Sequence, residues 1–264
     1  MKNQILSVLM TAYNAEKYIY ESVSSIINQS FKDWILILVD DKSDDNTVKI
    51  VKSFNNKKIK IYKLKKNIGR TNALNYGLKK CKTKYTAILD ADDVSSTHRL
   101  KKQINFLEKN KRFQMVGSWA YLIDSHGKKI GSKKTDRNFT KMTQSLKLLN
   151  YIPHSSITYS TSFAKKLGGY PSNLKYAQDF ALILKFLKVK KINVIPEYLV
   201  KCRFSENSMT FSKKYELTIA NDGIKLLQFS KKNFYLTKFQ LIKYYYLIAK
   251  FYIKLIKTYF KEKI

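Results

Sequence analysis

In the stretch "YTAILDADDVSS" (85–96), an apolar run is followed at once by Asp90, Asp92 and Asp93. A second stretch, "WILILVDDKSDDNT" (34–47), repeats the pattern, with an apolar run followed by Asp40, Asp41, Asp44 and Asp45. Short continuous apolar runs are typical of strands that are buried on both faces of a parallel sheet. Carboxylates this close together repel one another unless a cation or another partner compensates them. The two stretches therefore predict two buried strands whose ends share an acidic crevice.

Helical patterns alternate with apolar runs throughout the first third of the chain. The run "ILSVLM" (5–10) precedes a segment with apolar residues at helical spacing, and "IKIYKL" (59–64) precedes the helical pattern "GRTNALNYGLKKC" (69–81). Ser43 or Asp44 is expected to cap the helix that follows the second acidic cluster. Strands alternating with helices predict an α/β fold with a mostly parallel sheet covered on both faces. Ligands of such sheets bind outside the carboxyl ends of the strands, where both acidic clusters fall.

The rest of the chain is less regular and contains no internal repeat or Pro/Gly-rich linker. Its patterns predict a helix over 97–110, a strand over 113–124, a helix over 177–189 and a strand from about 193. Residues 212–264 have almost no turn signals and predict a helical tail. We therefore expect three parts, with boundaries at 1–93, 94–211 and 212–264.

The chain is strongly basic, with 51 Lys and Arg residues against 19 Asp and Glu residues and a formal net charge of +32. Nucleic acid, an anionic membrane and anionic substrates are the partners that such an excess favours. Abundant Lys, Asn, Ile, Tyr and Phe also indicate compositional drift, to which we ascribe half of the excess. Cys81 and Cys202 lack metal-type spacing, so we expect free thiols, which fit a reducing cytoplasm.

The end of the tail predicts a basic amphipathic helix. Five lysines recur at spacings that place them on one helical stripe, namely Lys243, Lys250, Lys254, Lys257 and Lys261. The remaining surface is aliphatic and aromatic and includes Leu247, Phe251, Leu255 and Ile256. No apolar stretch reaches the roughly 20 residues that a membrane span needs. We expect the helix to lie on an anionic membrane surface. The alternative is packing against the catalytic part or against a second subunit in a homodimer.

The order of the motifs carries a resemblance that covers the chain from Ser7 to Thr210. The motifs are "SVLMTAYNAEKYIYESVSSIINQSF" (7–31), "ILVDDKSDDNT" (37–47), "NIGRTNALNYGL" (67–78), "AILDADD" (87–93), "GGY" (168–170), "AQDF" (177–180) and "CRFSENSMT" (202–210). In this order they resemble the family 2 glycosyltransferases of GT-A fold. The resemblance implies a nucleotide-sugar-binding half (1–93) and an acceptor-binding, catalytic half (94–211).

The resemblance also implies a reaction, a substrate class and a place in the cell. A sugar would pass from a nucleotide-sugar, a UDP-hexose or UDP-N-acetylhexosamine, to a hydroxyl of a glycan or lipid-linked acceptor. Relatives of this kind build surface polysaccharide or lipooligosaccharide, so we expect a cytoplasmic protein that is peripheral on the cytoplasmic face of the inner membrane. Processive members of the family carry membrane spans and a Gln-x-x-Arg-Trp signature, and we find neither in the sequence. A single-sugar transfer is therefore favoured.

The residues at the donor side follow from the same resemblance. They place the nucleotide among Thr11, Tyr13, Asp41, Arg70 and Asp90. An aromatic ring at Tyr13 can stack on uracil, and the Asp41 carboxylate can accept a hydrogen bond from the uracil ring N–H. Asp90 and Asp92 match the two acids that hold Mn²⁺ or Mg²⁺ in the family, with Asp92 as the direct ligand, and hard oxygen ligands suit both ions.

The residues at the acceptor side include the catalytic base, which the resemblance assigns to Asp179 of "AQDF". One base without a covalent intermediate implies inversion at the anomeric carbon. Gln178 stands where most relatives have Glu. Asp93 matches a frequent third acid of unassigned role. His154 is expected to line the acceptor side or to be an ordinary loop histidine.

Three further residues have two readings each. Arg203, with Ser205, matches a basic loop that can close over the diphosphate, or else is a solvated surface arginine. Tyr151 and Trp119 are expected to belong to the core, with a sugar-stacking platform as the alternative.

Two other classes of function compete with the enzyme. The first is a nucleic-acid-binding module, which the net charge and the abundant tyrosine suggest. Its groove would need cations along one surface, whereas the predicted crevice is acidic, so we expect no nucleic-acid partner. The second is a glycan-binding relative without catalysis, and the retention of Asp90, Asp92 and Asp179 argues against it.

Overall fold

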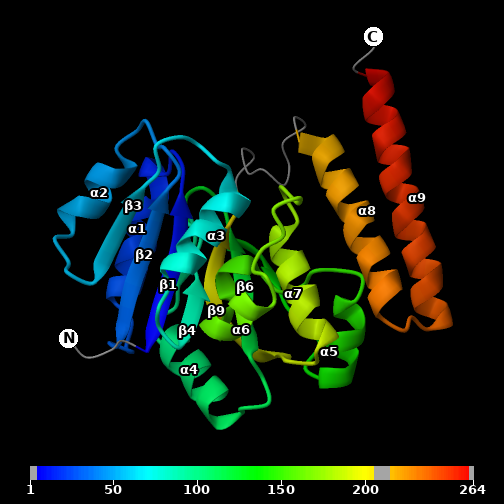
Figure 1. The fold of residues 1–264 in the computed structure, drawn as a ribbon, viewed down its shortest axis with the longest axis horizontal. Helices are drawn as coiled ribbons and strands as arrows, with labels where there is room; N and C mark the ends of the chain where they lie inside the picture. Colours follow the sequence, from blue (N-terminus) through cyan, green and yellow to red (C-terminus); the bar gives the residue numbers. More distant parts are fainter. Residues whose placement is uncertain (1–4, 205–214, 262–264) are drawn as a thin grey trace.

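The computed structural model describes residues 5–204 and 215–261, and within them one sheet runs through the molecule (Figure 1). The strand order is β3-β2-β1-β4-β8-β6-β9-β5, and β7 pairs with β6 outside this path. The strands are β1 (Leu6–Ala12), β2 (Trp34–Asp40), β3 (Ile59–Lys63), β4 (Tyr85–Ile88), β5 (Val94–Ser95), β6 (Met115–Ile123), β7 (Lys129–Lys133), β8 (Thr158–Ser160) and β9 (Ile192–Arg203). The α/β class expected from the sequence is confirmed.

Helices cover both faces of this sheet. They are α1 (Glu16–Ile27), α2 (Thr47–Ser53), α3 (Arg70–Lys80), α4 (Arg99–Lys109), α5 (Phe139–Leu146), the 3₁₀ turn η1 (His154–Ser156), α6 (Thr161–Lys166), α7 (Gln178–Lys188), α8 (Glu216–Asn233) and α9 (Lys238–Lys261). One buried cluster joins α1, α2 and α4 to the sheet, and another joins α3, α5, α6 and α7 to it. Two cores on opposite faces explain why the strands are continuous apolar runs.

The parallel strands β2, β1 and β4 end at the same edge of the sheet. Asp41 and Asp90 lie just beyond the ends of β2 and β4, as the sequence predicted. Beside β4, the antiparallel strand β8 follows η1, whose residues lie against the chain after β4. The fold therefore brings residues 150–156 to the acidic edge, although they are sixty or more positions from Asp90 in the sequence.

The tail consists of two antiparallel helices rather than one. The chain reverses between α8 and α9, where Thr237 and Gln240 hydrogen-bond to each other's backbone N–H groups. In Figure 1, α8 lies between α7 and α9, and α9 is the outermost element. Leu247 and Phe251 pack on a small core shared with α8, so they do not belong to a free apolar face as the sequence suggested. No helix among the described residues is long and apolar enough to cross a membrane.

Two local expectations were wrong or incomplete. The N-cap of α2 is Asn46. The side chain of the preceding residue, Asp45, accepts hydrogen bonds from the N–H groups of Thr47 and Glu16. The two residues expected to cap the helix have other partners, because Ser43 accepts a hydrogen bond from the N–H of Asn14 and Asp44 pairs with Lys42. The interaction between the starts of α1 and α2 therefore decides the cap, and a pattern within α2 cannot show it. The sequence also did not predict β5, β7, β8 and α5, which are short or polar.

Candidate active site

Asp90, Arg70 and His154 form a cluster at the acidic edge of the sheet. Arg70, the first residue of α3, places Nη2 2.5 Å from Oδ2 of Asp90. Nδ1 of His154 lies 3.2 Å from Oδ1 of Asp90 and 3.2 Å from Nη2 of Arg70. Burial alone would raise the pKa of Asp90, but Arg70 and His154 outweigh it and hold this pKa well below its usual range. Asp90 is therefore an anion that is already neutralised within the protein.

His154 is buried, and both of its ring nitrogens have partners. Besides the Asp90 contact of Nδ1, Nε2 lies 3.0 Å from the hydroxyl of Tyr170, and the two rings meet edge to face. Tyr170 follows Gly168 and Gly169, which both adopt positive φ and end the α6 segment. The structure thus places His154 behind Asp90, where it orients the carboxylate.

Asp92 differs from Asp90 in having a carboxylate without a protein partner. Among the described residues, no other residue donates a hydrogen bond to its side chain; only its carbonyl oxygen accepts one, from Nε of Arg203 at 3.0 Å. Burial, followed by the neighbouring charge of Asp90, raises the pKa of Asp92 to about 6. A half-buried carboxylate in this state would gain from a cation.

The donor set at this edge fits a divalent cation that arrives with other ligands. No group of three or more His, Cys, Asp or Glu side chains is arranged to hold a metal in the described part of the chain. Asp90 is occupied by Arg70 and His154, which leaves Asp92 as the open oxygen ligand. Mg²⁺ and Mn²⁺ commonly bind through one or two carboxylates and take their remaining ligands from substrate phosphates and water. The residues therefore fit such an ion.

Asp93 and Arg203 fasten the loop that carries Asp90 and Asp92. Oδ2 of Asp93 accepts a hydrogen bond from the hydroxyl of Ser155, and Oδ1 accepts one from the N–H of Arg203 at 2.7 Å. Burial, followed by the charge of Asp92, raises the pKa of Asp93. Asp93 therefore joins the end of β4 to β9 and to η1, which is a role that the sequence did not reveal.

All three nitrogen atoms of the Arg203 guanidinium donate hydrogen bonds. It donates to the carbonyl of Asp92, to the carbonyl of Asp124 at 3.0 Å, and to Oε2 of Glu21 at 2.5 Å. The side chain is 2% exposed, so the expectation of a solvated surface arginine was wrong. Ser205, which the sequence grouped with it, lies outside the described residues.

Thr11, Tyr13 and Asp41 lie at the carboxyl ends of β1 and β2. Asp41 is buried, and its two oxygens accept hydrogen bonds from the N–H groups of Ile68 and Gly69 at 2.8 and 2.9 Å. Burial, only partly offset by these bonds, raises the pKa of Asp41. Each oxygen keeps a further lone pair for a ligand. The ring of Tyr13 is 52% exposed and Thr11 is half-buried, so the edge offers an aromatic face beside a polar acceptor.

Asp179 lies in the first turn of α7, and its Oδ2 accepts a hydrogen bond from Nδ2 of Asn150 at 3.1 Å. Burial lowers the pKa of Arg70, but the charges of Asp90 and then Asp179 outweigh it and raise that pKa. The Asp179 carboxylate is therefore close enough to Arg70 to act on the same cluster. The loop before α7 is held from α8, because Asp222 accepts hydrogen bonds from the N–H groups of Lys175 and Tyr176.

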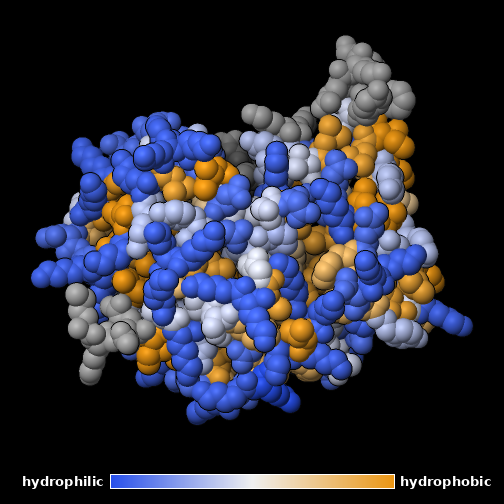
Figure 2. Space-filling view, in the orientation of Figure 1, coloured by the Kyte–Doolittle hydropathy of each residue, from blue (hydrophilic) through white to orange (hydrophobic). Residues whose placement is uncertain are grey.

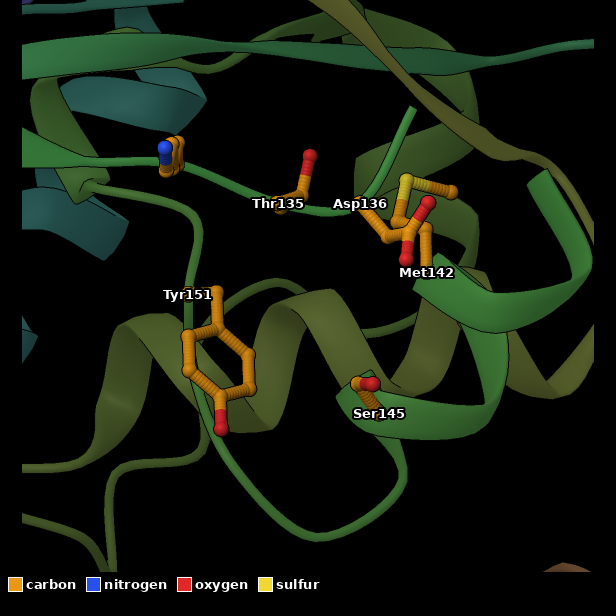
Figure 3. A pocket seen from close by; sticks show the side chains of 6 residues that line it. Thr135, Asp136, Met142, Ser145 and Tyr151 are labelled. Atoms are coloured by element: carbon orange, nitrogen blue, oxygen red, sulfur yellow. The ribbon is translucent and has the colours of Figure 1, made fainter. Parts of the chain in front are cut away.

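A pocket of about 320 Å³ opens on the acceptor side (Figure 3). The ring of Tyr151 stands on one side of it, and Asp136, Met142 and Ser145 stand on the other. Tyr151 is half-buried and directly follows Asn150, the partner of Asp179. Tyr151 therefore lines a cavity near the candidate base, whereas Trp119 is buried in the core as expected.

Three residues that support the site were not found from the sequence, namely Asn150, Ser155 and Tyr170. Their side chains are common polar or aromatic types without a distinctive spacing. The two glycines before Tyr170 were the available signal, because they mark a fixed turn.

Comparison with known proteins gives a match of residues 7–168 to the family model described as glycosyl transferase family 2. A curated relative from Escherichia coli is named UDP-Glc:alpha-D-GlcNAc-diphosphoundecaprenol beta-1,3-glucosyltransferase WfgD. It is 28% identical over 221 residues, which cover 82% of this chain and 84% of the relative.

Two solved structures resemble the fold. TarS 1–349 of S. aureus in complex with UDP-GlcNAc superposes with a TM-score of 0.72 at 20% identity, covering 94% of this chain and 72% of TarS. The mannosyltransferase PcManGT from Pyrobaculum calidifontis, in complex with GDP-Man and Mn²⁺, gives a TM-score of 0.68 at 16% identity and covers 98% of this chain and 74% of that protein. At these identities the likeness concerns the GT-A fold.

Proposed function

Because the chain belongs to glycosyltransferase family 2, we propose that it transfers one sugar, with inversion, from a UDP-sugar to a hydroxyl of a glycan or lipid-linked acceptor. The observation that carries the proposal is the half-buried Asp92 carboxylate, to which no other described residue donates a hydrogen bond, beside the Arg70–Asp90 pair and Asp179. The relative WfgD is named for UDP-Glc and a diphosphoundecaprenol-linked acceptor, and the TarS complex contains UDP-GlcNAc. Both support a UDP-hexose or UDP-N-acetylhexosamine as the donor.

The donor is held by the edge of the sheet. Its uracil stacks on the exposed ring of Tyr13 beside Thr11, and the Asp41 carboxylate accepts a hydrogen bond from the ring N–H. The two backbone N–H groups on Asp41 keep that carboxylate in place before the nucleotide arrives. Arg70 and Asp90 lie next along the edge, where Asp90 accepts from the ribose and Arg70 supplies positive charge near the diphosphate.

A Mn²⁺ or Mg²⁺ ion bound with the donor would neutralise charge on the departing diphosphate, the usual Lewis-acid contribution. Asp92 is the carboxylate that would hold this ion, with Asp90 beside it. The PcManGT complex contains Mn²⁺, which supports metal use within this fold. Arg203 fixes the Asp92 backbone, so the ligand does not have to be ordered when the ion binds.

Asp179 is the proposed general base. An acceptor hydroxyl that attacks the anomeric carbon must lose its proton, and a positioned carboxylate can take it. Asn150 binds Oδ2 of Asp179 and leaves Oδ1 to face the hydroxyl. The acceptor would enter from the side of the Tyr151 pocket, where an aromatic ring and the Asp136 carboxylate are suited to a sugar.

The expected place of action is the cytoplasmic face of the inner membrane, in synthesis of surface polysaccharide or lipooligosaccharide. The lipid-linked acceptor in the name of WfgD supports a peripheral position. Cys81 and Cys202 are free thiols, which agrees with a reducing compartment.

A donor screen with one variant tests the proposal. Purified protein is incubated with individual nucleotide-sugars and Mn²⁺, and hydrolysis or transfer is measured with and without EDTA. We expect one UDP-sugar to be turned over, and we expect EDTA to abolish turnover. Asp179→Asn is nearly isosteric but cannot take the proton, so transfer should fall ~10²–10⁴-fold while UDP affinity persists. Full turnover in excess EDTA would contradict the proposed metal dependence. A collapse of UDP affinity in Asp179→Asn would contradict the proposed role of Asp179 as the general base.

A further inference from the structure

The outer face of α9 is an uncovered surface on which several exposed apolar side chains follow one another. We define the outer face by Phe239, Ile242, Tyr246, Ile253 and Ile256, which follow helical spacing on the side away from α8. Their side chains are between 53% and 84% exposed. Figure 2 shows hydrophobic residues at the surface of this part of the molecule, next to hydrophilic ones. Scattered exposed apolar residues are ordinary, but a contiguous stripe indicates a binding surface.

A row of lysines borders the outer face on one side. Lys243, Lys250 and Lys257 are exposed and recur every seven residues, and the first and last of them directly follow Ile242 and Ile256 of the outer face. Residues 238–258 contain no Asp or Glu. On the opposite border, Tyr245 and Tyr252 are 56% and 49% exposed. The hydroxyl of Tyr245 accepts a hydrogen bond from Nζ of Lys231 on α8 at 2.9 Å, and the hydroxyl of Tyr252 can reach water beside an apolar partner.

The remaining face of α9 is already occupied. Tyr244 and Leu236 belong to the core shared with α8, and Leu247, Ile248 and Phe251 pack against that core. Lys254 points toward Glu216 of α8, with 3.6 Å between Nζ and Oε1. The helix therefore stays folded on α8 whatever binds the outer face, and the outer face can act without rearrangement of the protein.

We propose that the outer face of α9 is the surface by which the protein lies on an anionic lipid bilayer. Its aliphatic side chains enter the boundary between headgroups and acyl chains, the tyrosines sit at headgroup level, and the lysine row meets the anionic headgroups. The inference gives a structural basis to the peripheral position proposed above, but it rests on the surface of α9 and on no property of the donor site.

Charge decides between the bilayer and a second copy of the chain. A two-fold dimer through the outer face would bring two lysine rows to one interface, and residues 238–258 supply no carboxylate to oppose them. Each copy also carries a formal net charge of +32, which opposes self-association. An anionic bilayer complements the same row of lysines, and each lysine near the membrane surface increases the binding affinity about five-fold.

Sedimentation with liposomes tests the inference on the full chain. Vesicles of phosphatidylcholine alone are compared with vesicles containing about 30% phosphatidylglycerol at low salt. We expect the protein to sediment with the anionic vesicles alone. Ile242→Asp/Ile253→Asp should reduce the bound fraction at least ten-fold. The matched control is Ile130→Asp, where the side chain is 54% exposed but belongs to β7 and not to the outer face of α9, and binding should be unchanged.

A second pair of variants isolates the charge. Lys243→Gln/Lys250→Gln/Lys257→Gln should weaken binding about 100-fold, whereas Lys49→Gln/Lys52→Gln/Lys57→Gln, exposed lysines on or after α2, should weaken it by less than ten-fold although the net charge is the same. Equal loss in both triple variants would mean that binding follows net charge alone and would overturn the proposal. It would also be overturned if the intact protein ignored anionic vesicles. A dimer in solution that Ile242→Asp/Ile253→Asp dissociates would make a second copy the occupant instead.

The readout separates this inference from the proposed function. Vesicle binding requires no donor, metal or acceptor, so Asp179→Asn should bind vesicles like the unchanged protein. Loss of transfer with retained vesicle binding would count against the catalytic proposal alone. Loss of vesicle binding with retained turnover of a soluble acceptor would count against the role of α9 alone.

Discussion

Asp92 is a half-buried acid that the protein keeps at a cost to its own stability. Its pKa is raised from 3.8 to about 6, first by burial and then by Asp90. A folded-state pKa above the unfolded value means that the folded chain holds the proton more tightly. Stability is therefore lost as the pH rises from the unfolded pKa through the folded one, and the loss persists above it. Such a penalty is common where a site is built for a ligand that is absent.

The first prediction concerns this penalty in metal-free protein. Asp92→Asn removes the ionisation, so in EDTA it should raise the stability at about pH 7.5 by an amount on the order of 1 kcal/mol relative to its effect at about pH 4. Thermal unfolding at the two pH values measures the difference. An effect of the substitution that is equal at both pH values would contradict the raised pKa of Asp92. Mn²⁺ added together with UDP should stabilise the unchanged protein more than the variant.

Arg203 illustrates how one buried side chain can hold a site that it does not enter. Arg203→Ala would leave the carbonyl of Asp92 without its donor and the carbonyl of Asp124 with the N–H of Gly127 alone, and it would leave the cavity of the lost side chain. We expect a loss of about 2–4 kcal/mol in the free energy of unfolding from urea titration. Glu21→Gln is the control, because Glu21 is 54% exposed and its loss should cost less than about 1 kcal/mol. Equal effects of the two variants would show that the ion pair matters more than the carbonyl contacts.

At the scale of elements, the α8–α9 pair depends on a close approach at one glycine. A Cβ atom at Gly223 would lie 2.5 to 2.9 Å from three atoms of the Phe251 ring. The rings of α9 therefore reach the backbone of α8 only because position 223 has no side chain. This contact explains why the apolar residues of the tail divide between a covered face and the outer face.

Gly223→Ala should destabilise the helix pair although alanine is the better helix former. The clash with Phe251 should cost about 1–3 kcal/mol and exceed the gain in helix propensity of about 1 kcal/mol. Gly131→Ala on β7 is the control, because its nearest contact would be an ordinary 3.6 Å from Leu122. Combining Gly223→Ala with Phe251→Leu should recover part of the loss. If Gly223→Ala raised the melting temperature instead, the packing of α9 on α8 would be looser than the structure shows.

The elements that could be predicted from the sequence are those whose pattern is set locally. The strands β1, β2 and β4 are buried on both faces, and α3, α4 and α7 have clear apolar stripes, so each was visible from composition. The short strands β5 and β8 have only two and three residues and exist because neighbours in space pair with them. The ends of α2 and the division of faces on α9 likewise depend on contacts with α1 and α8. A pattern within one segment cannot contain that information.

At the scale of the whole molecule, the site combines residues of both kinds. Asp41, Asp90 and Asp92 were placed by the rule that parallel strands present their ends to a ligand. Three other contacts form where segments that are distant in the sequence meet. They are the contact of His154 with Asp90, the hydrogen bond from Ser155 to Asp93, and the hydrogen bond from Asn150 to Asp179. Their roles in transfer remain predictions for the variants above.

The charge of the whole molecule yields a further prediction. An excess of +32 should give weak, sequence-independent binding to DNA at low salt, because released counterions drive it. This binding should vanish near about 200 mM salt, whereas UDP affinity should change little, since the donor is held by specific contacts. Filter binding of labelled DNA and calorimetry with UDP measure the two. DNA that stays bound at that salt and competes with UDP would revive the nucleic-acid alternative.

The continuous sheet also bears on how chains of this kind can recombine. β4 pairs with β8, and β8 pairs with β6. The strand that precedes Asp90 and the strand that follows His154 are therefore neighbours in one sheet. A crossover near residue 93 between two homologues would have to preserve that register on both sides, since a slip of one position turns every side chain to the opposite face. A crossover after β9 would leave every ladder intact. The donor and acceptor halves should therefore be inherited together, while the α8–α9 pair can be exchanged as a cassette, provided that the contact from Asp222 to the loop before Asp179 is kept.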